Sequence, residues 1–149
     1  MIEMSGWKSG AMDDLVGQDL RDVLAGVDSP DWSVRAAAGR RLAAVPRIEE
    51  VADVLHRLLL DPHDTGVTSD TAGALLARKD VAGLRALLRA RAVASSDGTA
   101  DQLDAELDCD EGWMTDEGGD QLIAQLRTLT SDADPDVRSE ALLRLARLN

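Results

Sequence analysis

The 149-residue sequence contains no Phe and no Tyr, only three Trp and a single Cys. With so few aromatic residues, the core has to be built from Leu, Val, Ile and Ala, whose small side chains let helices pack closely. The lone Cys109 excludes an internal disulfide and any cysteine cluster for a metal, and a reducing compartment is the simplest fit. Strand-like alternation of polar and apolar residues is also missing, so an all-α fold is expected.

Long apolar runs are absent as well. No segment approaches the roughly 18 consecutive apolar residues of a membrane helix. The opening residues, MIEMSGWKSG, lack the apolar stretch of a signal peptide. These absences predict a cytoplasmic protein with no membrane partner.

Positive charge is scarce, with 16 Lys and Arg against 28 Asp and Glu, a formal net charge of -12 and a sequence pI near 4.4. Such a chain repels phosphate backbones, so no nucleic-acid partner is expected. The same charge attracts a protein with a basic surface over long range. It also fits a merely solvated acidic surface.

Recognised catalytic and metal-binding motifs are missing too. There is no G-x-S-x-G, no H-E-x-x-H and no Gly-rich phosphate loop, so neither an enzymatic activity nor a cofactor is expected. A calcium loop counted from Asp104 has Cys109 and Thr115 where EF-hands need Gly and Glu. His56 and His63 show no ligand spacing and are interpreted as surface and turn residues.

What the sequence does contain is a repeated helical pattern. The segment at 134–148, DPDVRSEALLRLARL, and the segment at 31–43, DWSVRAAAGRRLA, share residues at seven positions in one register. Weaker copies begin near Asp64 and Thr99. The apolar signature position, which is expected on the buried inner face of each second helix, falls at Val34, Val67, Leu103 and Val137, with steps of 33, 36 and 34 residues. A near-constant period of this size is typical of stacked helical repeats.

Breaks at prolines and at Ser95 to Gly98 divide the chain into helix-turn-helix units. The first 11 residues have no periodicity and are expected to form a disordered leader. Residues 12–149 are then expected to form a single domain, with units at about 12–46, 47–79, 80–115 and 116–149.

The repeated segments resemble the second helix of HEAT repeats, including the short form found in many bacterial proteins. This resemblance implies an α-solenoid of about four repeats whose second helices line a concave binding surface. It also implies a polar ladder between units, formed by Asp31, Arg35, Asp134 and Arg138. Thr68 replaces the arginine in the second unit and Asp104 replaces it in the third, so the ladder is expected to be interrupted.

The most unusual segment is 97–120, which carries ten acidic residues and no Lys or Arg. A helix running from Thr99 to Met114 would turn Leu103, Leu107 and Met114 toward the core. It would also align a stripe of carboxylates on the binding surface, beside an aromatic anchor at Trp113. The predicted partner-binding residues are Asp101, Asp104, Asp108, Glu111 and Trp113. The alternative is that the stripe is solvated or pairs internally with Arg85, Arg89 and Arg91.

These observations favour a non-enzymatic protein-binding module. One form of it is an immunity or antitoxin-like protein that neutralises a basic toxin. A HEAT-like enzyme or enzyme accessory, related to DNA-repair proteins or lyases, is the alternative from another class. A third alternative is a homo-oligomeric structural part, of unknown oligomeric state, paired through Val16, Leu20 and Val23.

Overall fold

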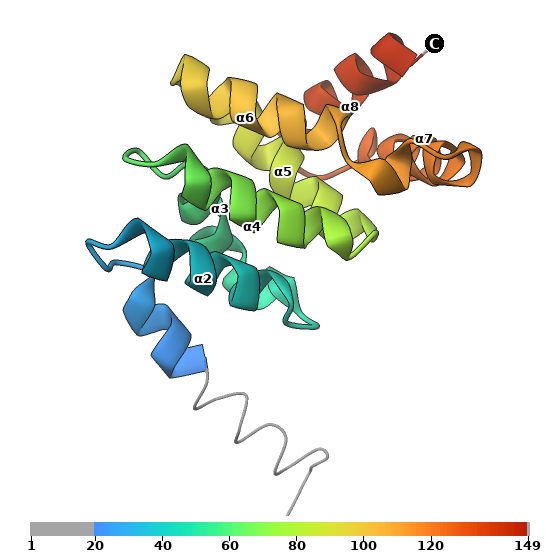
Figure 1. Cartoon of the computed structure of the whole chain (residues 1–149). Helices are drawn as coiled ribbons and strands as arrows, with labels where there is room; N and C mark the ends of the chain where they lie inside the picture. The colour runs from blue at the N-terminus through green and yellow to red at the C-terminus, as the bar shows by residue number, and fades with distance from the viewer. Residues whose placement is uncertain (1–19, 149) are drawn as a thin grey trace, which may run out of the picture.

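The computed structural model describes residues 20–148, and within them every regular element is helical, as expected (Figure 1). The expected leader at 1–11 and the expected start of the first helix, with Val16, lie outside the described residues. No helix within the described range combines the length and the apolar character that crossing a membrane requires.

Caps and turns from the local sequence set the helix boundaries. Asp31, Asp64, Asp80 and Thr115 each occupy an N-cap, where a side-chain oxygen accepts a hydrogen bond from a backbone N–H of the first turn. Residues 20–26 are helical. The elements that follow are α2 (Trp32–Ala43), η1 (Ile48–Val51), α3 (Ala52–Leu59), α4 (Thr65–Ala77), α5 (Val81–Val93), α6 (Asp97–Asp108), η2 (Glu111–Trp113), α7 (Asp116–Leu129) and α8 (Pro135–Leu148).

The helices form two layers. In one layer α2 packs on α4 and α4 packs on α6, and these three helices lie one above the other in Figure 1. In the other layer α3 packs on α5 and α5 packs on α7. The last helix departs from this alternation, because α8 packs chiefly against α5 and α7 rather than extending the row beyond α6.

The interface between α2 and α4 is close because Gly39 has no side chain. A Cβ at Gly39 would lie 2.0 Å from the Thr71 hydroxyl oxygen. Polar side chains then link the exposed edges of the same row, where Arg40 on α2 pairs with Asp70 on α4, and Ser69 on α4 donates a hydrogen bond to Glu106 on α6.

The core consists of aliphatic side chains from both layers, with Leu55, Leu75, Leu87, Leu103 and Leu126 among those almost fully buried. The signature position is buried at Val67, Leu103 and Val137, but Val34 is 41% exposed. Burial of Val34 is therefore a wrong prediction. Its physical reason is position, since α2 begins the described row and no helix of that row precedes it.

Two residues near the ends of the described chain are buried. Val23, one of the residues through which the alternative homo-oligomer would pair, is only 6% exposed and belongs to the core. Arg144 on α8 is 7% exposed, because it points at carboxylates of α6. In contrast, Leu142 and Leu143 on α8 are more than half exposed.

Two threonine hydroxyls on α4, those of Thr68 and Thr71, are buried and have no hydrogen-bond partner among the described residues. A buried hydroxyl without a partner destabilises the fold. We therefore expect Thr68→Val, which removes the hydroxyl at nearly constant volume, to raise the free energy of unfolding by about 1 kcal/mol in urea titrations. Thr65→Val, at an exposed position of the same helix, is the control and should change little. A loss of stability in Thr68→Val would contradict the prediction.

Candidate functional site

The acidic segment does not form one long helix. α6 begins at Asp97 and ends at Asp108, and its own residues Thr99, Leu103 and Leu107 are buried. The chain then makes the short helix η2, and Thr115 caps α7. The prediction of a helix from Thr99 to Met114 is therefore wrong, and Glu111 lies on η2 instead of on the α6 stripe.

Asp104 forms ion pairs with two arginines, Arg91 on α5 and Arg144 on α8. Partial burial by itself would raise the pKa of Asp104, but the hydrogen bonds from both guanidinium groups outweigh burial and hold the pKa below its usual range. The internal pairing with Arg91, which was the alternative interpretation of the stripe, is thus present at this position. Asp104 is a structural link between three helices.

Asp108 lies further along α6 and is more available to a partner. Its carboxylate accepts a hydrogen bond of 3.1 Å from Arg144, yet the side chain is 62% exposed. Asp101 is exposed and forms no ion pair within the described part of the chain. The two other arginines proposed as internal partners bind elsewhere, Arg85 to Asp132 and Arg89 to Asp53.

Trp113 is a buried residue, not an exposed anchor. Its side chain is 6% exposed, and the Nζ atom of Lys79 lies 4.5 Å from the centroid of the ring. Lys79 also forms an ion pair with Asp110. The neighbouring Met114, expected to face the core, is instead 70% exposed.

Lys79 is positioned for these contacts by an unusual backbone conformation. It follows the end of α4 with a φ of 57°, the left-handed region that favours glycine. From there its side chain reaches over η2, while its carbonyl accepts a hydrogen bond from Gln125 on α7. Lys79 therefore fastens the α4–α5 turn to both η2 and α7.

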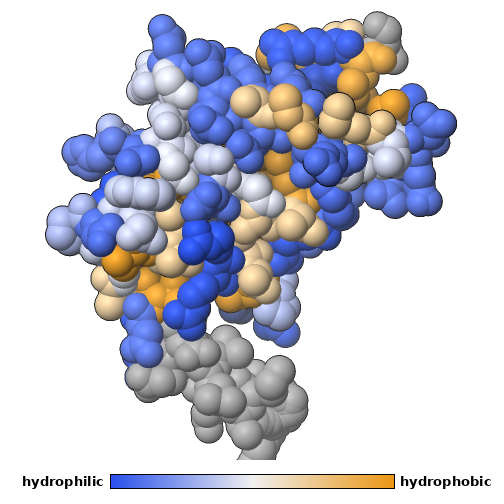
Figure 2. All heavy atoms as spheres, in the orientation of Figure 1, coloured by the Kyte–Doolittle hydropathy of each residue, from blue (hydrophilic) through white to orange (hydrophobic). Residues whose placement is uncertain are grey.

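The exposed part of this region is a short acidic rim, which we define as Asp108, Glu111, Met114, Asp116 and Glu117. All five side chains are exposed. Glu111, Asp116 and Glu117 form no ion pair within the described residues, although Asp116 and Glu117 lie in the first turn of α7, where negative charge stabilises a helix. In Figure 2 the surface of α7 is mainly hydrophilic.

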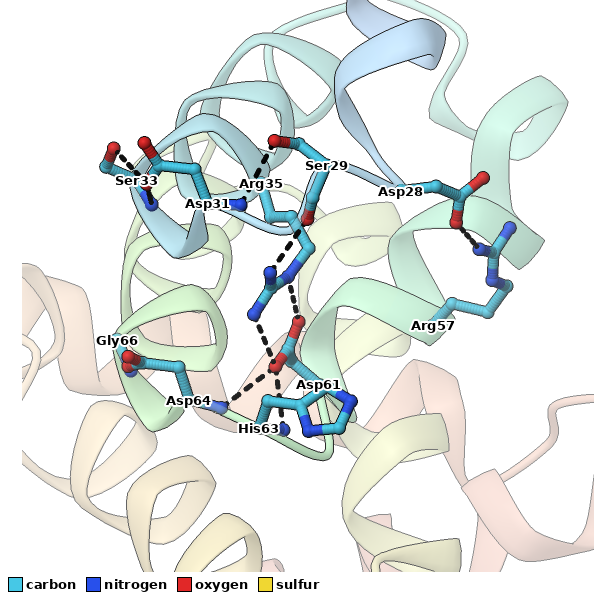
Figure 3. Close-up of polar contacts among 10 residues, drawn as sticks. All are labelled: Asp28, Ser29, Asp31, Ser33, Arg35, Arg57, Asp61, His63, Asp64 and Gly66. Atoms are coloured by element: carbon cyan, nitrogen blue, oxygen red, sulfur yellow. Dashed lines mark hydrogen bonds and ion pairs between the residues drawn. The ribbon is translucent and has the colours of Figure 1, made fainter.

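A second polar cluster lies where α2, α3 and α4 meet (Figure 3). Arg35 on α2 donates hydrogen bonds from Nε and Nη2 to the carboxylate of Asp61, at 2.7 and 3.2 Å, and from Nη1 to the carbonyl of Ser29. Asp61 also accepts hydrogen bonds from the backbone N–H groups of His63 and Asp64. The cluster connects the turn before α2 to the turn before α4.

The other residues predicted for a polar ladder have local roles. Asp31 and Asp134 accept hydrogen bonds from backbone N–H groups two residues ahead, which is the geometry of a helix cap. Arg138 donates hydrogen bonds to the carbonyls of Asp132 and Ala133 in its own turn. Among these residues, only Arg35 forms a contact between successive helix pairs through its side chain.

The Arg35–Asp61 pair predicts a dependence of stability on pH. Burial would raise the pKa of Asp61, but the hydrogen bonds from Arg35, His63 and Asp64 lower it below its usual value. Because the pKa is lower in the folded chain, the contribution to stability is complete above the unfolded value of about 3.9 and is lost as the pH falls below it.

We expect Asp61→Asn to lower the free energy of unfolding by about 2 kcal/mol at pH 7, because Arg35 loses its charged partner. The difference from wild type should shrink in urea titrations at pH 3. Asp70→Asn is the matched control. Asp70 pairs with Arg40, which lies on α2 like Arg35, but the side chains of this pair are 38% and 53% exposed. A constant difference between pH 7 and pH 3 would contradict the assignment.

The two histidines do not form a metal site, and the described residues contain no cluster of three or more side chains suited to hold a metal ion. His63 is exposed beside Asp61, as expected for a turn residue. His56 is half-buried, and its Nδ1 atom has no hydrogen-bond partner within residues 20–148. Burial, together with the nearby Arg89, lowers the pKa of His56.

No family model matches the chain, and no curated protein or solved structure is significantly similar to it. The resemblance to HEAT repeats therefore rests on the repeated pattern, and any function has to be argued from the geometry of these sites.

Proposed function

We propose that this protein is a non-enzymatic, HEAT-like binding module that engages a basic protein through the acidic rim. The layered packing of α2, α4 and α6 and the link between Arg35 and Asp61 are compatible with a HEAT-like stack. The arrangement of α8 against α5 marks where the chain departs from regular stacking.

The observation that carries the proposal is the exposure of Met114 close in the chain to exposed carboxylates. Met114 is 70% exposed, and Glu111, Asp116 and Glu117, all within three residues of it in the chain, have no internal ion-pair partner in the described chain. An exposed apolar side chain flanked in the chain by carboxylates suits a partner that presents Lys and Arg around an apolar contact. Met is also adaptable in shape at binding surfaces.

The rim is held in place before any partner arrives. Trp113 lies beneath Lys79, and Asp110 pairs with Lys79, so η2 is fastened to the turn between α4 and α5. A surface that is already ordered loses less conformational entropy on binding. This arrangement assigns Trp113 and Asp110 to support of the rim, and Glu111, Met114, Asp116 and Glu117 to contact with the partner.

The test compares two charge-reversed chains of equal net charge in pull-downs from the native host lysate. The first is Glu111→Lys, Asp116→Lys, Glu117→Lys in the rim, and the control is Asp22→Lys, Glu50→Lys, Asp136→Lys at exposed positions elsewhere. Circular dichroism checks that both fold. We expect a partner retained by wild type and by the control to be lost by the rim variant. Equal retention by both variants would reject the rim as the binding surface.

The immunity or antitoxin-like form of this proposal makes a narrower prediction. If the partner is a basic toxin, adding the chain abolishes its activity, and adding the rim variant does not. The complex should also persist near 1 M salt, where the Debye length is about 3 Å and weak long-range attraction is screened. A partner that dissociates at that salt concentration would favour a simple scaffold over a neutraliser.

A further inference from the structure

A groove on the α3 and α5 layer remains outside the proposed function. It lies between η1, α3 and α5 and has a volume of about 330 Å³. A volume of this size is at the lower end of the range for small-molecule sites. The groove is therefore large enough for a small molecule and too small for a helix or a folded partner.

The floor of the groove is apolar because its central positions carry small side chains. Ala52, Ala82 and Ala86 leave space that larger residues would fill, while Leu55 and Val81 complete the apolar lining. Leu55 is fully buried in the core, so the floor is rigid. An apolar floor of this kind accommodates an alkyl chain better than a polar metabolite.

Two arginines line the edge of the groove in a chain with a net charge of -12, and each of them is ion-paired with one carboxylate. Arg85 and Arg89 line the groove together with His56, and Glu49 is the carboxylate among the lining residues. Both arginines come from the same face of α5, one turn apart. The groove thus combines an apolar floor with two guanidinium groups at its edge.

Both guanidinium groups retain N–H donors for a ligand. Arg85 donates from Nε and Nη2 to Asp132, and its Nη1 donors have no partner among the described residues. Within the same part of the chain, Arg89 donates only from Nη2, to Asp53, and the Asp53 side chain is 90% exposed. An arginine held by one carboxylate can still bind a second through its remaining donors.

We propose that this groove binds a small amphipathic carboxylate, with its alkyl chain along Ala52, Ala82 and Ala86 and its carboxylate on Arg89 and Arg85. The apolar floor supplies affinity, and the free N–H donors select an anionic head group over a neutral or cationic one. The site is separate from the acidic rim and uses none of its residues.

The test is calorimetric titration of the full chain with octanoate, octan-1-ol and octylamine, which share an alkyl chain and differ in charge. We expect octanoate to bind most tightly, with one molecule per chain, and octylamine to bind most weakly. Decanoate should bind roughly tenfold more tightly than octanoate, because two more methylene groups are buried. Equal binding of octylamine and octanoate, or no binding of octanoate, would overturn the proposal.

Matched variants locate the site. Arg89→Gln should weaken octanoate roughly tenfold and leave octanol unchanged, because it removes a charge-assisted hydrogen bond. Arg40→Gln, which removes another exposed ion-paired arginine, should have no effect. Ala86→Leu should abolish binding of both ligands by filling the groove, whereas Ala100→Leu on α6 should not. Unchanged octanoate binding in Ala86→Leu would place the ligand elsewhere.

The two histidines provide a second readout that does not depend on variants. His56 lines the groove and His63 does not. Octanoate should therefore shift the ring resonances of His56 in proton NMR spectra and leave those of His63 in place. Movement of both resonances, or of His63 alone, would contradict binding in this groove.

Discussion

Trp113→Ala is expected to lower the free energy of unfolding by about 3–5 kcal/mol, the usual cost of deleting a buried aromatic side chain. The Trp113 ring is buried in the core, and Lys79 lies over it. Truncation leaves a cavity and removes the cation–π contact. Urea unfolding followed by circular dichroism measures the loss without relying on tryptophan fluorescence.

The adjacent Met114 provides the control. It is 70% exposed, so Met114→Ala should change the free energy of unfolding by less than about 0.5 kcal/mol. In pull-downs, Met114→Ala should nevertheless weaken retention of the partner, because Met114 lies on the proposed contact surface. If instead Met114→Ala destabilises the fold and Trp113→Ala does not, then the packing of η2 described above is wrong.

Gly118→Ala is expected to lower the free energy of unfolding by about 3 kcal/mol, because a Cβ at this position overlaps the backbone. It would lie 1.7 Å from the carbonyl oxygen of Gly112. A backbone atom cannot rotate away as a side chain does, so η2 or the first turn of α7 has to shift. Thermal unfolding and urea titration both report the loss.

The neighbouring Gly119 makes the prediction specific. A Cβ there would lie 3.7 Å from the Trp113 carbonyl oxygen, an ordinary contact. Gly119→Ala should therefore stabilise α7 by about 0.5–1 kcal/mol through helix propensity. Two Gly→Ala changes at adjacent positions of one helix are thus expected to have opposite signs. Destabilisation of similar size in both would point to a general intolerance of α7 to alanine.

The helices and their starts could be predicted from local sequence, because caps act over a few residues. The sequence offers Thr115 or Asp116 as the start of α7, and in the structure Thr115 is the N-cap and Asp116 the first helical residue. Pro135 opens α8, in the first turn that proline favours, and Asp31 caps α2. In these places, the physical cause lies within one turn of the helix.

The exchange of roles between Trp113 and Met114 could not be predicted in the same way. It depends on Lys79, which is distant in sequence and adopts a left-handed conformation that lysine rarely adopts. The helical periodicity of the acidic segment does not indicate the contact between Lys79 and Trp113. The sequence therefore identified the unusual segment, but it predicted an exposed Trp113 and a buried Met114, and the structure shows the reverse.

The pairing of the acidic stripe was predictable only in part. Arg91 precedes α6 closely and was already a candidate for Asp104. Arg144, in contrast, belongs to α8 and reaches Asp104 and Asp108 only because α8 packs across α5. A repeat model places α8 at the end of a row, and the ion pairs of Arg144 with α6 cannot be predicted from that position.

The position of α8 also affects how the molecule unfolds. Solenoids of nearest-neighbour units fray from their ends, because each unit contacts only the next. Here α8 packs against α5, and its Arg144 pairs with a carboxylate of α6. The turn before α8 is also linked to α5, because Asp132 pairs with Arg85. Amide protons of α5, α6 and α8 should therefore exchange through a single opening event, which makes the C-terminal half one cooperative unit.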